Sequence, residues 1–356
     1  MSSDPSAETQ HIARWDLDKT YLRTEFDTLR DIVKTALERA DEKRSHPGAA
    51  ALLRELQAAH VEIHVLSGSP EQMRRRLSAK LQLDGIRFAS LTLKPNLQNL
   101  MRLRFRSIRG QLGYKLPALL SMRADVDAAV HETLVGDDAE ADAFIYALYA
   151  DLCAGIVSTE LLEEVMRADR CHPEEIALAV SSASLLERGR VVDRILIHLD
   201  QQTPPGDFAV FGARLVPFYN YFQAALVLHE DRRLSADAVL RVGTDLVLQH
   251  RFDGDALVRS YLDLARRGHL RGTAIDELMG ALSRWPQAKG SSPLQTLGDD
   301  GGIARAAFGL DEVHALARRE SDLRAATRAH GSEPPPSIRR PDYLSLVEEH
   351  NRRHRR

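Results

Sequence analysis

Two acidic residues near the N-terminus are the first candidates for chemistry. Asp16 and Asp18 lie two positions apart, and Thr20 follows two further on. Residues 11–14 suit a short strand, in which residues i and i+2 point the same way. If that strand ends near Asp16, both carboxylates enter one pocket past its carboxyl end, where open α/β sheets bind ligands. Adjacent carboxylates repel, so they need a cation or a shared proton, and Mg²⁺ fits that need. Alone, the pair is more typical of a solvated turn than of a catalytic site.

A serine and a lysine could stabilise a phosphoryl group. Ser67 follows residues 61–66, whose alternating, β-branched pattern predicts a strand, and it precedes a predicted helix. Its hydroxyl and the following backbone N–H groups could hold phosphate oxygens, although a serine there also suits a simple helix cap. Lys115 is predicted at the start of a helix, where its ammonium would neutralise phosphoryl charge. Lys94 follows a predicted strand at 86–93 and competes for this role; we favour Lys115 because it shortly precedes the last acidic group.

The last acidic group follows a predicted strand at residues 132–135. Asp137 and Asp138 come shortly after it, and Asp142 opens a predicted helix. All three are candidate Mg²⁺ ligands, because carboxylate oxygens suit this cation. Asp138 and Glu140 could instead cap the helix, where acids suit the helix dipole. If the strand predictions hold, all these groups meet at one edge of a parallel sheet.

The pattern of elements predicts where these groups are held. Strand-like and helix-like segments alternate through the first half, which predicts an α/β, Rossmann-like, mostly parallel sheet with helices on both faces. Beyond about residue 157 strand signals disappear, and helices are predicted at 161–168, 174–188, 191–199, 206–229, 235–250, 253–267 and 273–283. We therefore expect a catalytic domain at 1–156, an all-helical domain at 157–285, and a Gly/Ser/Pro-rich linker with a basic tail at 286–356.

Composition narrows the class of protein. The chain has 356 residues, 44% of them hydrophobic, with a net charge of −3, which gives no electrostatic reason to expect nucleic acid as the main partner. Its two cysteines indicate no disulfide framework and a reducing compartment. Residues 1–10 lack the apolar core of a signal peptide, and no run of 18 apolar residues occurs. We expect a cytoplasmic protein.

One segment between Ser67 and Lys115 is strongly basic. Its cations alternate with apolar residues, at Arg102, Arg104, Arg106 and Arg109. The segment could contact an anionic substrate or a membrane surface, or it could simply be a solvated loop or helix.

Together these motifs resemble those of the haloacid dehalogenase superfamily, in order and spacing, over about residues 10–155. Local strings at 16–20, 66–70, 114–115 and 136–142 resemble the catalytic domain of the actin-patch-associated phosphatidate phosphatase family. Lys19 and Gly68 stand where that family tends to have Asp and Asn or Ser.

The resemblance implies a role for each catalytic group. Asp16 would be the nucleophile and form an aspartyl-phosphate. Asp18 would protonate the leaving group and then deprotonate water. Ser67 and Lys115 would stabilise charge on the transferred phosphoryl oxygens.

The resemblance also implies a Mg²⁺ site. Its ligands would be Asp16, the backbone carbonyl of Asp18 and Asp137, with Asp142 or Asp138 completing the shell through water.

We therefore expect a Mg²⁺-dependent phosphatase acting on a phosphomonoester, with a large or lipid substrate. No large cap segment precedes Lys115, so the site would be open, and the helical half could supply a lid. The alternative is a non-enzymatic interaction protein in which the helical domain binds a protein partner and the core is a scaffold.

Overall fold

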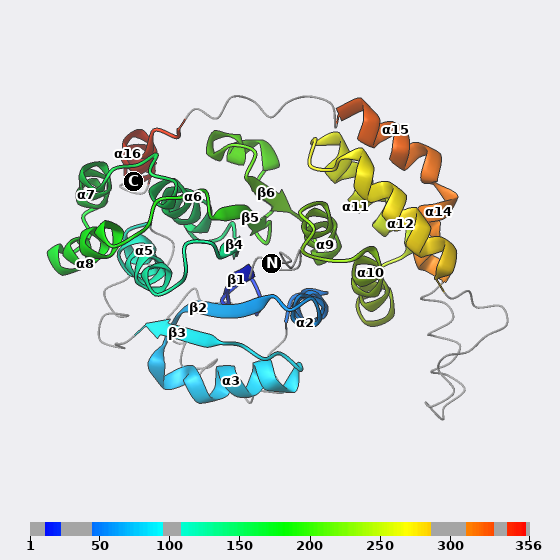
Figure 1. Cartoon of the computed structure of the whole chain (residues 1–356), viewed down its shortest axis with the longest axis horizontal. Helices are drawn as coiled ribbons and strands as arrows, with labels where there is room; N and C mark the ends of the chain where they lie inside the picture. The colour runs from blue at the N-terminus through cyan, green and yellow to red at the C-terminus, as the bar shows by residue number, and fades with distance from the viewer. Residues whose placement is uncertain (1–10, 23–44, 95–107, 286–310, 331–339, 354–356) are drawn as a thin grey trace, which may run out of the picture. The chain divides into compact units, whose positions relative to one another are not determined.

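One parallel sheet forms the centre of the fold. The computed structural model describes residues 11–22, 45–94, 108–285, 311–330 and 340–353. Within them, six strands form one sheet in the order β3-β2-β1-β4-β5-β6 (Figure 1). The strands are β1 (His11–Asp16), β2 (Glu62–Pro70), β3 (Ser90–Lys94), β4 (His131–Asp137), β5 (Val192–His198) and β6 (Leu215–Phe218). The chain moves from β1 out to β3 and then crosses to the other side of β1. This confirms the predicted α/β fold and places the reversal between β1 and β4, where open sheets bind ligands.

Contacts divide the chain into two units, and the sheet belongs almost wholly to the first. This unit comprises residues 1–45, 60–217 and 336–356. Its helices in the described residues are η1 (Glu71–Met73), α3 (Arg74–Leu83), α5 (Ile108–Ala124), α6 (Asp142–Cys153), α7 (Thr159–Ala168), α8 (Pro173–Ser184), η2 (Pro205–Phe211) and α16 (Tyr343–Arg353). Every residue of α6 is buried, so this helix forms the middle of the unit's apolar core.

Helix α5 begins earlier than the sequence predicted. It starts at residue 108, so Lys115 lies in its middle and Pro117 inside it. Proline within a helix removes one backbone hydrogen bond and costs about 3 kcal/mol. The helix continues because four of its leucines, Leu112, Leu116, Leu119 and Leu120, are completely buried. Tertiary packing therefore outweighs the local signal that suggested a helix start.

Strands β5 and β6 correct the prediction that only helices follow residue 157. The sequence predicted helices at 191–199 and 206–229, whereas residues 192–198 and 215–218 are strands. Strand β5 pairs in parallel with β4, and its last four residues are buried. A short apolar run covered on both faces fits a helix and a buried parallel strand equally well. The sheet thus extends well beyond the predicted boundary at 156.

The second unit contains only helices among its described residues. It comprises residues 46–59 and 218–335, with α2 (Ala49–Ala58), α9 (Tyr221–Glu230), α10 (Ala236–His250), α11 (Gly254–Arg266), α12 (Gly272–Arg284), α14 (Ala315–Arg318) and α15 (Glu320–His330). Helix α2, which we expected in the catalytic domain, packs here: Glu55 pairs with Arg241 of α10 at 2.7 Å. Gly48 precedes α2 with φ +81°, and a Cβ there would lie 3.1 Å from Tyr221 Cβ. Only glycine suits this close approach.

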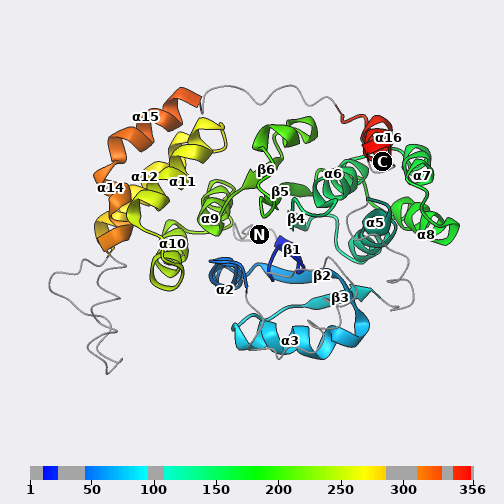
Figure 2. The ribbon, with the colours of Figure 1, turned by 180° about the vertical axis from the view of Figure 1, so that it is seen from behind.

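The predicted C-terminal tail contains a docked helix. Helix α16 lies beside α7 in the first unit (Figures 1 and 2). The buried Tyr343 hydroxyl donates to Asp151 Oδ2 at 2.7 Å, and its ring meets Phe144 edge-on at 5.6 Å. Asn351 donates to the Ala168 carbonyl at 3.2 Å. Residues 286–356 are therefore more than a linker and tail.

A buried ion pair joins the two central strands below their carboxyl ends. Arg14 of β1 donates to both carboxylate oxygens of Glu132 on β4, at 2.9 and 2.7 Å. Arg123 and Tyr149 donate to the same carboxylate at 3.1 and 2.7 Å. Breaking a buried pair of this kind costs about 3–5 kcal/mol, so the network fixes β1 and β4 against each other.

Candidate active site

The strand register brings the predicted catalytic groups to one edge of the sheet. Asp16 is paired with Leu66 of β2, and Trp15 with Val135 of β4. Ser67 and Asp137 therefore extend one and two positions beyond these pairs, on either side of the end of β1. This is the edge at which the sheet reverses its order, as the sequence predicted.

Asp16 is a buried carboxylate whose negative charge is stabilised by few neighbouring groups. Its side chain is fully buried, and neither carboxylate oxygen accepts a hydrogen bond from the described residues. The Lys115 ammonium lies 2.9 Å from Oδ1, while the neighbouring carboxylates of Asp142, Glu140 and Asp137 disfavour the negative charge of Asp16. Burial raises the pKa of Asp16 well above its usual value, against the opposing effect of Lys115. The group needs further positive charge to be ionised, as a nucleophile must be.

Asp18 is held by two hydroxyl groups on β2. Ser67 Oγ donates to Oδ2 at 2.6 Å, and Ser69 Oγ lies 3.0 Å from both carboxylate oxygens. The Ser69 backbone N–H in turn donates to Ser67 Oγ at 3.0 Å. Burial raises the pKa of Asp18, although the two hydroxyls favour its ionised form. A raised pKa and fixed orientation suit a carboxyl group that delivers a proton.

Lys115 is surrounded by three carboxylates. Its Nζ lies 2.5 Å from Asp142 Oδ1, 2.9 Å from Asp16 Oδ1 and 2.9 Å from Glu140 Oε2. Burial opposes its charge, but these carboxylates outweigh burial and raise the pKa of Lys115 well above its usual value. Lys115 is thus a permanent cation of the site. Lys94, the competing candidate, instead lies 5.5 Å from the centre of the Tyr114 ring.

Asp137 and Asp142 are both fully buried beside Lys115. Asp137 Oδ2 accepts from the Thr20 hydroxyl at 3.0 Å, and its Oδ1 accepts from the Ala139 backbone N–H at 2.7 Å. Burial raises the pKa of Asp137 well above its usual value and raises the pKa of Asp142 to about 6. Gly136 leaves room for this arrangement, because a Cβ there would lie 2.3 Å from Asp142 Oδ2.

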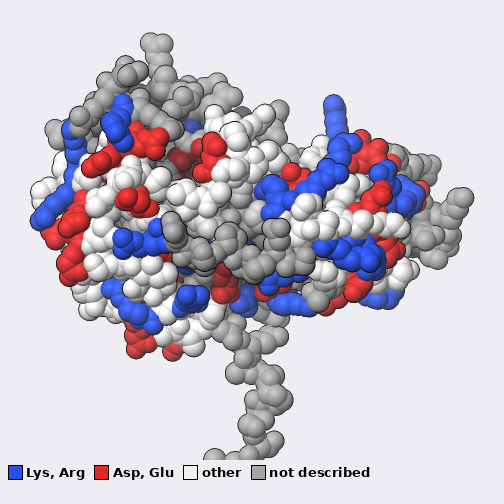
Figure 3. Space-filling view, turned by 90° about the horizontal axis from the view of Figure 1, so that it is seen from above, with Lys and Arg blue, Asp and Glu red and all other residues white. Residues whose placement is uncertain are grey.

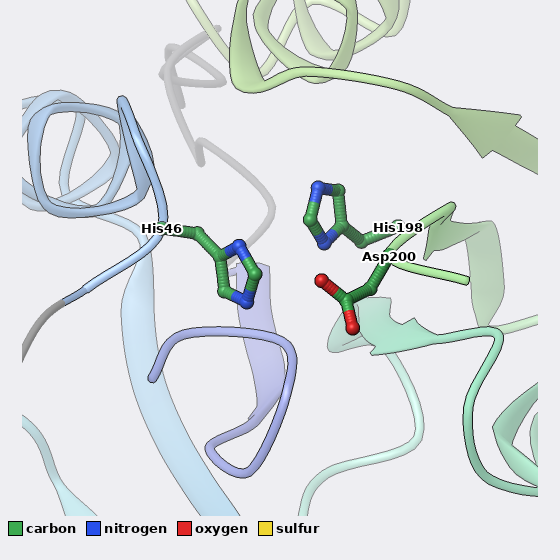
Figure 4. Close-up of side chains that lie close together, drawn as sticks. All are labelled: His46, His198 and Asp200. Carbon is green, nitrogen blue, oxygen red and sulfur yellow. The ribbon is translucent and has the colours of Figure 1, made fainter. Parts of the chain in front are cut away.

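Asp138 has a different role from its neighbours. Its carboxylate accepts from the backbone N–H groups of Gln201 and Thr203, at 2.8 and 2.9 Å. Those residues belong to the turn that follows β5, whose last residue is His198. Figure 4 labels His198 and Asp200, where the chain leaves this strand. Asp138 therefore ties this turn to β4. Between the two acids that we considered for the metal shell, the geometry favours Asp142.

Sequence reasoning missed two contributing residues. Glu140 was considered only as a helix cap, yet it contacts Lys115. Ser69 was considered only for its backbone, yet its hydroxyl reaches Asp18. Ser69 is two positions after Ser67 in a strand, which is the spacing for side chains on one face. The predicted strand ended at residue 66, whereas β2 runs on to residue 70 and so includes Ser69.

The donor set fits a hard divalent cation. One oxygen from each of Asp16, Glu140 and Asp142 lies within 4.8 Å of the others, and oxygen ligands are those that Mg²⁺ prefers. The unsatisfied oxygens of Asp16 supply the independent indication, since buried carboxylates without donors are costly. Residues that could hold an ion are therefore present.

Residues 15–159 match the family model for the catalytic domain of phosphatidate phosphatase APP1. The match confirms the resemblance to the phosphatidate phosphatase catalytic domain, and residues 15–159 include every site residue that the sequence predicted. Residues 15–159 are therefore similar to the catalytic domain of a phosphatase family. No curated protein and no solved structure matches the chain.

Two further features bear on whether the protein contacts a membrane. None of the described helices is both long and apolar enough to cross a membrane. On the face in Figure 3, the described basic side chains lie among acidic ones. The predicted membrane contacts Arg102, Arg104 and Arg106 lie outside the described residues, as does the side chain of Arg109.

Proposed function

We propose that this protein is a Mg²⁺-dependent phosphatase that cleaves phosphomonoesters through an aspartyl-phosphate on Asp16. The observation that carries the proposal is Asp16 itself. It is a buried carboxylate at the end of the central strand, its oxygens accept no hydrogen bond from the described residues, and a fixed ammonium lies 2.9 Å away. The match of residues 15–159 to a phosphatase family supports it.

The chain's own groups can perform both halves of the reaction. An Asp16 oxygen attacks phosphorus, the bond from phosphorus to the leaving oxygen breaks, and Asp18 gives that oxygen its proton. Water then attacks the same phosphorus and loses a proton to Asp18, and the bond to Asp16 breaks to release inorganic phosphate. Lys115 stabilises charge on the phosphoryl oxygens, and Ser67 does so when its hydroxyl turns from Asp18 to the phosphoryl group.

A divalent ion would be held by Asp16 and Asp142 of the observed cluster, together with Asp137 beside them, as the resemblance implies. When bound, it would neutralise phosphoryl charge, a contribution that such ions commonly make in phosphoryl transfer. The same positive charge would keep Asp16 ionised despite its burial. These ligands come from the ends of β1 and β4 and the start of α6.

The family match favours phosphatidate, a membrane lipid, as substrate. The basic segment at Arg102–Arg109 would then contact the anionic membrane surface, where each cation contributes about 1 kcal/mol. Loss of liposome co-sedimentation when these four arginines become alanine would support this contact, and unchanged binding would contradict it.

The decisive test compares Asp16→Asn with the wild type. With Mg²⁺ present, hydrolysis of an aryl phosphate should fall by about a thousandfold or more, as for other removed nucleophiles. Asp125→Asn is the matched control, because Asp125 is exposed. Equal rates in Asp16→Asn and wild type would contradict the proposal. Absence of hydrolysis in both would favour the interaction protein that we considered as the alternative.

A further inference from the structure

Helix α8 of the first unit leaves two leucines exposed to solvent. Leu178 is 52% exposed, and Leu185, at the C-cap of the helix, is 74% exposed. The inner face of the helix, with Ile176, Ala179 and Ala183 buried, packs against α5 and α7. In Figures 1 and 2 the helix lies on the outer side of α5. Its other face is therefore open to a partner.

This open face carries almost no charge. We call it the outer face of α8, and it comprises the exposed residues Glu174, Ala177, Leu178, Ser181, Ser184 and Leu185. Their spacing of three and four places them in one stripe along the helix. Residues 176–186 contain no charged side chain, whereas the solvent face of a surface helix usually carries several. The neighbouring α7 follows that rule with exposed Glu164 and Arg167.

The two serines of the outer face do not oppose its burial. Ser181 Oγ donates to the Leu178 carbonyl at 3.0 Å, and Ser184 Oγ donates to the Val180 carbonyl at 2.8 Å. Each hydroxyl proton is thus bonded within the helix, and a partner can cover it without leaving a donor unpaired. The small serine side chains also let a second helix approach closely.

The outer face is complementary to a reversed copy of itself. Ala177 and Leu178 lie four and three positions before Ser181, and Ser184 and Leu185 lie three and four positions after it. A second α8 running antiparallel about Ser181 therefore places each leucine opposite a small residue, Leu185 opposite the partner's Ala177 and Leu178 opposite the partner's Ser184. Large side chains opposite small ones are what close helix packing needs. A two-fold symmetric dimer uses the same patch on both subunits in this way.

Charges at the two ends of α8 favour the same orientation. The exposed acid of the outer face, Glu174, lies in the first turn. Two exposed cations, Arg188 and Arg190, follow the end of the helix, and Glu187 beside them lines a hollow with Asp127 of the turn after α5. An antiparallel copy brings Glu174 towards the partner's Arg188 and the partner's Arg190, whereas a parallel copy brings like charges together.

We propose that the outer face of α8 is the interface of a symmetric dimer, in which α8 of a second copy of this chain packs antiparallel against it. The interface lies outside residues 15–159, which match the phosphatase family, and it does not depend on the proposed catalytic function. Helix α8 has 12 residues and is about 18 Å long, so the contact is small. Small interfaces belong to weak complexes, and we expect a dissociation constant in the micromolar range.

Sedimentation equilibrium of the full chain between about 1 and 100 μM tests the dimer, because this range covers micromolar dissociation constants. The average mass of the wild type should rise from the 39.8 kDa of one chain towards twice that value. Leu185→Glu should weaken association by about tenfold or more, because it buries an unpaired carboxylate against the partner. Leu83→Glu is the matched control, since Leu83 is a 66% exposed leucine on α3, and should associate as the wild type does. Both variants change exposed side chains and should keep the wild-type midpoint of thermal unfolding.

Charge reversal tests the orientation. Glu174→Arg and Arg190→Glu should each weaken association by about threefold, the effect of one exposed ion pair, and the double variant should recover it. A wild type that stays at the mass of one chain would overturn the inference. So would equal association of Leu185→Glu and wild type, or an equal loss in Leu83→Glu. A dimer that the double charge reversal fails to recover would overturn the antiparallel arrangement.

Discussion

Without metal, the site should make this protein less stable as pH rises. Four carboxylates, Asp16, Asp137, Glu140 and Asp142, are gathered near the single ammonium of Lys115. Burial raises the pKa values of three of them, and for Asp142 the value is about 6 instead of 3.8. Each such group stabilises the fold while protonated, and that stabilisation is lost as pH rises through its folded pKa.

The magnitude follows from Asp142. A rise of about two pKa units corresponds to about 3 kcal/mol. About half of that, about 1.5 kcal/mol, would be lost between about pH 5 and pH 8. The remainder is lost as pH rises towards 5. Glu132 acts in the opposite direction there: Arg14, Tyr149 and Arg123 together outweigh burial and lower its pKa, so its stabilising contribution is lost as pH falls. Lys115 adds no slope in this range, since its raised pKa keeps it charged throughout.

Mg²⁺ should reverse this trend, because it binds only the ionised carboxylates. At 100 times its dissociation constant, it would stabilise the protein by about 2.7 kcal/mol. Wild type with Mg²⁺ should therefore gain most at pH 8, where the metal-free form has lost most.

Urea unfolding followed by tryptophan fluorescence measures these changes in the free energy of unfolding for the first unit, which contains the site. The chain has two tryptophans, so in a Trp285→Phe background the signal comes from Trp15 alone, which is buried beside Asp16. Asp142→Asn should flatten the metal-free pH dependence by about 1.5 kcal/mol between pH 5 and pH 8. Asp125→Asn should keep the wild-type slope. The reasoning fails if the metal-free wild type is equally stable at both pH values, or if Asp142→Asn leaves the slope unchanged.

Two further substitutions probe the site geometry. Gly136→Ala should cost about 1–3 kcal/mol of stability and most of the activity, because the new Cβ would lie 2.3 Å from Asp142 Oδ2. Gly206→Ala is the control, because a Cβ there would have no atom within 4 Å. Similar unfolding midpoints for the two variants would contradict the prediction. Ser69→Ala removes a hydroxyl that lies 3.0 Å from both oxygens of Asp18, so kcat should fall about tenfold for an alkyl phosphate and less for an activated aryl phosphate, whose leaving oxygen needs no proton. Recovery in Ser69→Thr would support the positioning role, and equal losses for both substrates would refute it.

The site could be predicted from sequence because it depends on strand ends. Asp16 and Asp137 end the strands β1 and β4, and Ser67 lies one position beyond the partner of Asp16 on β2, so parallel pairing brings all three to one edge. Lys115 was found for its proximity to the acidic motif, although its helix begins seven residues earlier. These predictions needed only local patterns and the rule that parallel strands end together.

What the sequence could not predict depends on long-range packing. The apolar run of β5 is ambiguous until its neighbours are known, because β4 pairs with it across more than fifty residues. Helix α2 has an ordinary amphipathic pattern, and only its contacts with α10 assign it to the helical unit. The pattern around Glu140 equally suits a cap, and its contact with Lys115 arises from the folding of α5 against α6.

The charge balance of the site assigns Lys115 two successive roles. An ammonium has three donors, and here three carboxylates lie within 2.9 Å of it. Glu140 and Asp142 accept hydrogen bonds from it, and Asp16 is an ion-pair partner without one, so a phosphoryl oxygen that approaches Lys115 closely would compete with these carboxylates. Asp142 is further fixed by the Asp137 backbone N–H at 3.3 Å, and Asp16 must remain close to attack phosphorus. Glu140 is the least buried of the three, with 8% of its side chain exposed, and can yield its place at the smallest cost. Lys115 is the counterion of a crowded acidic site; in the mechanism that we propose, the same charge would stabilise the phosphoryl group once substrate binds.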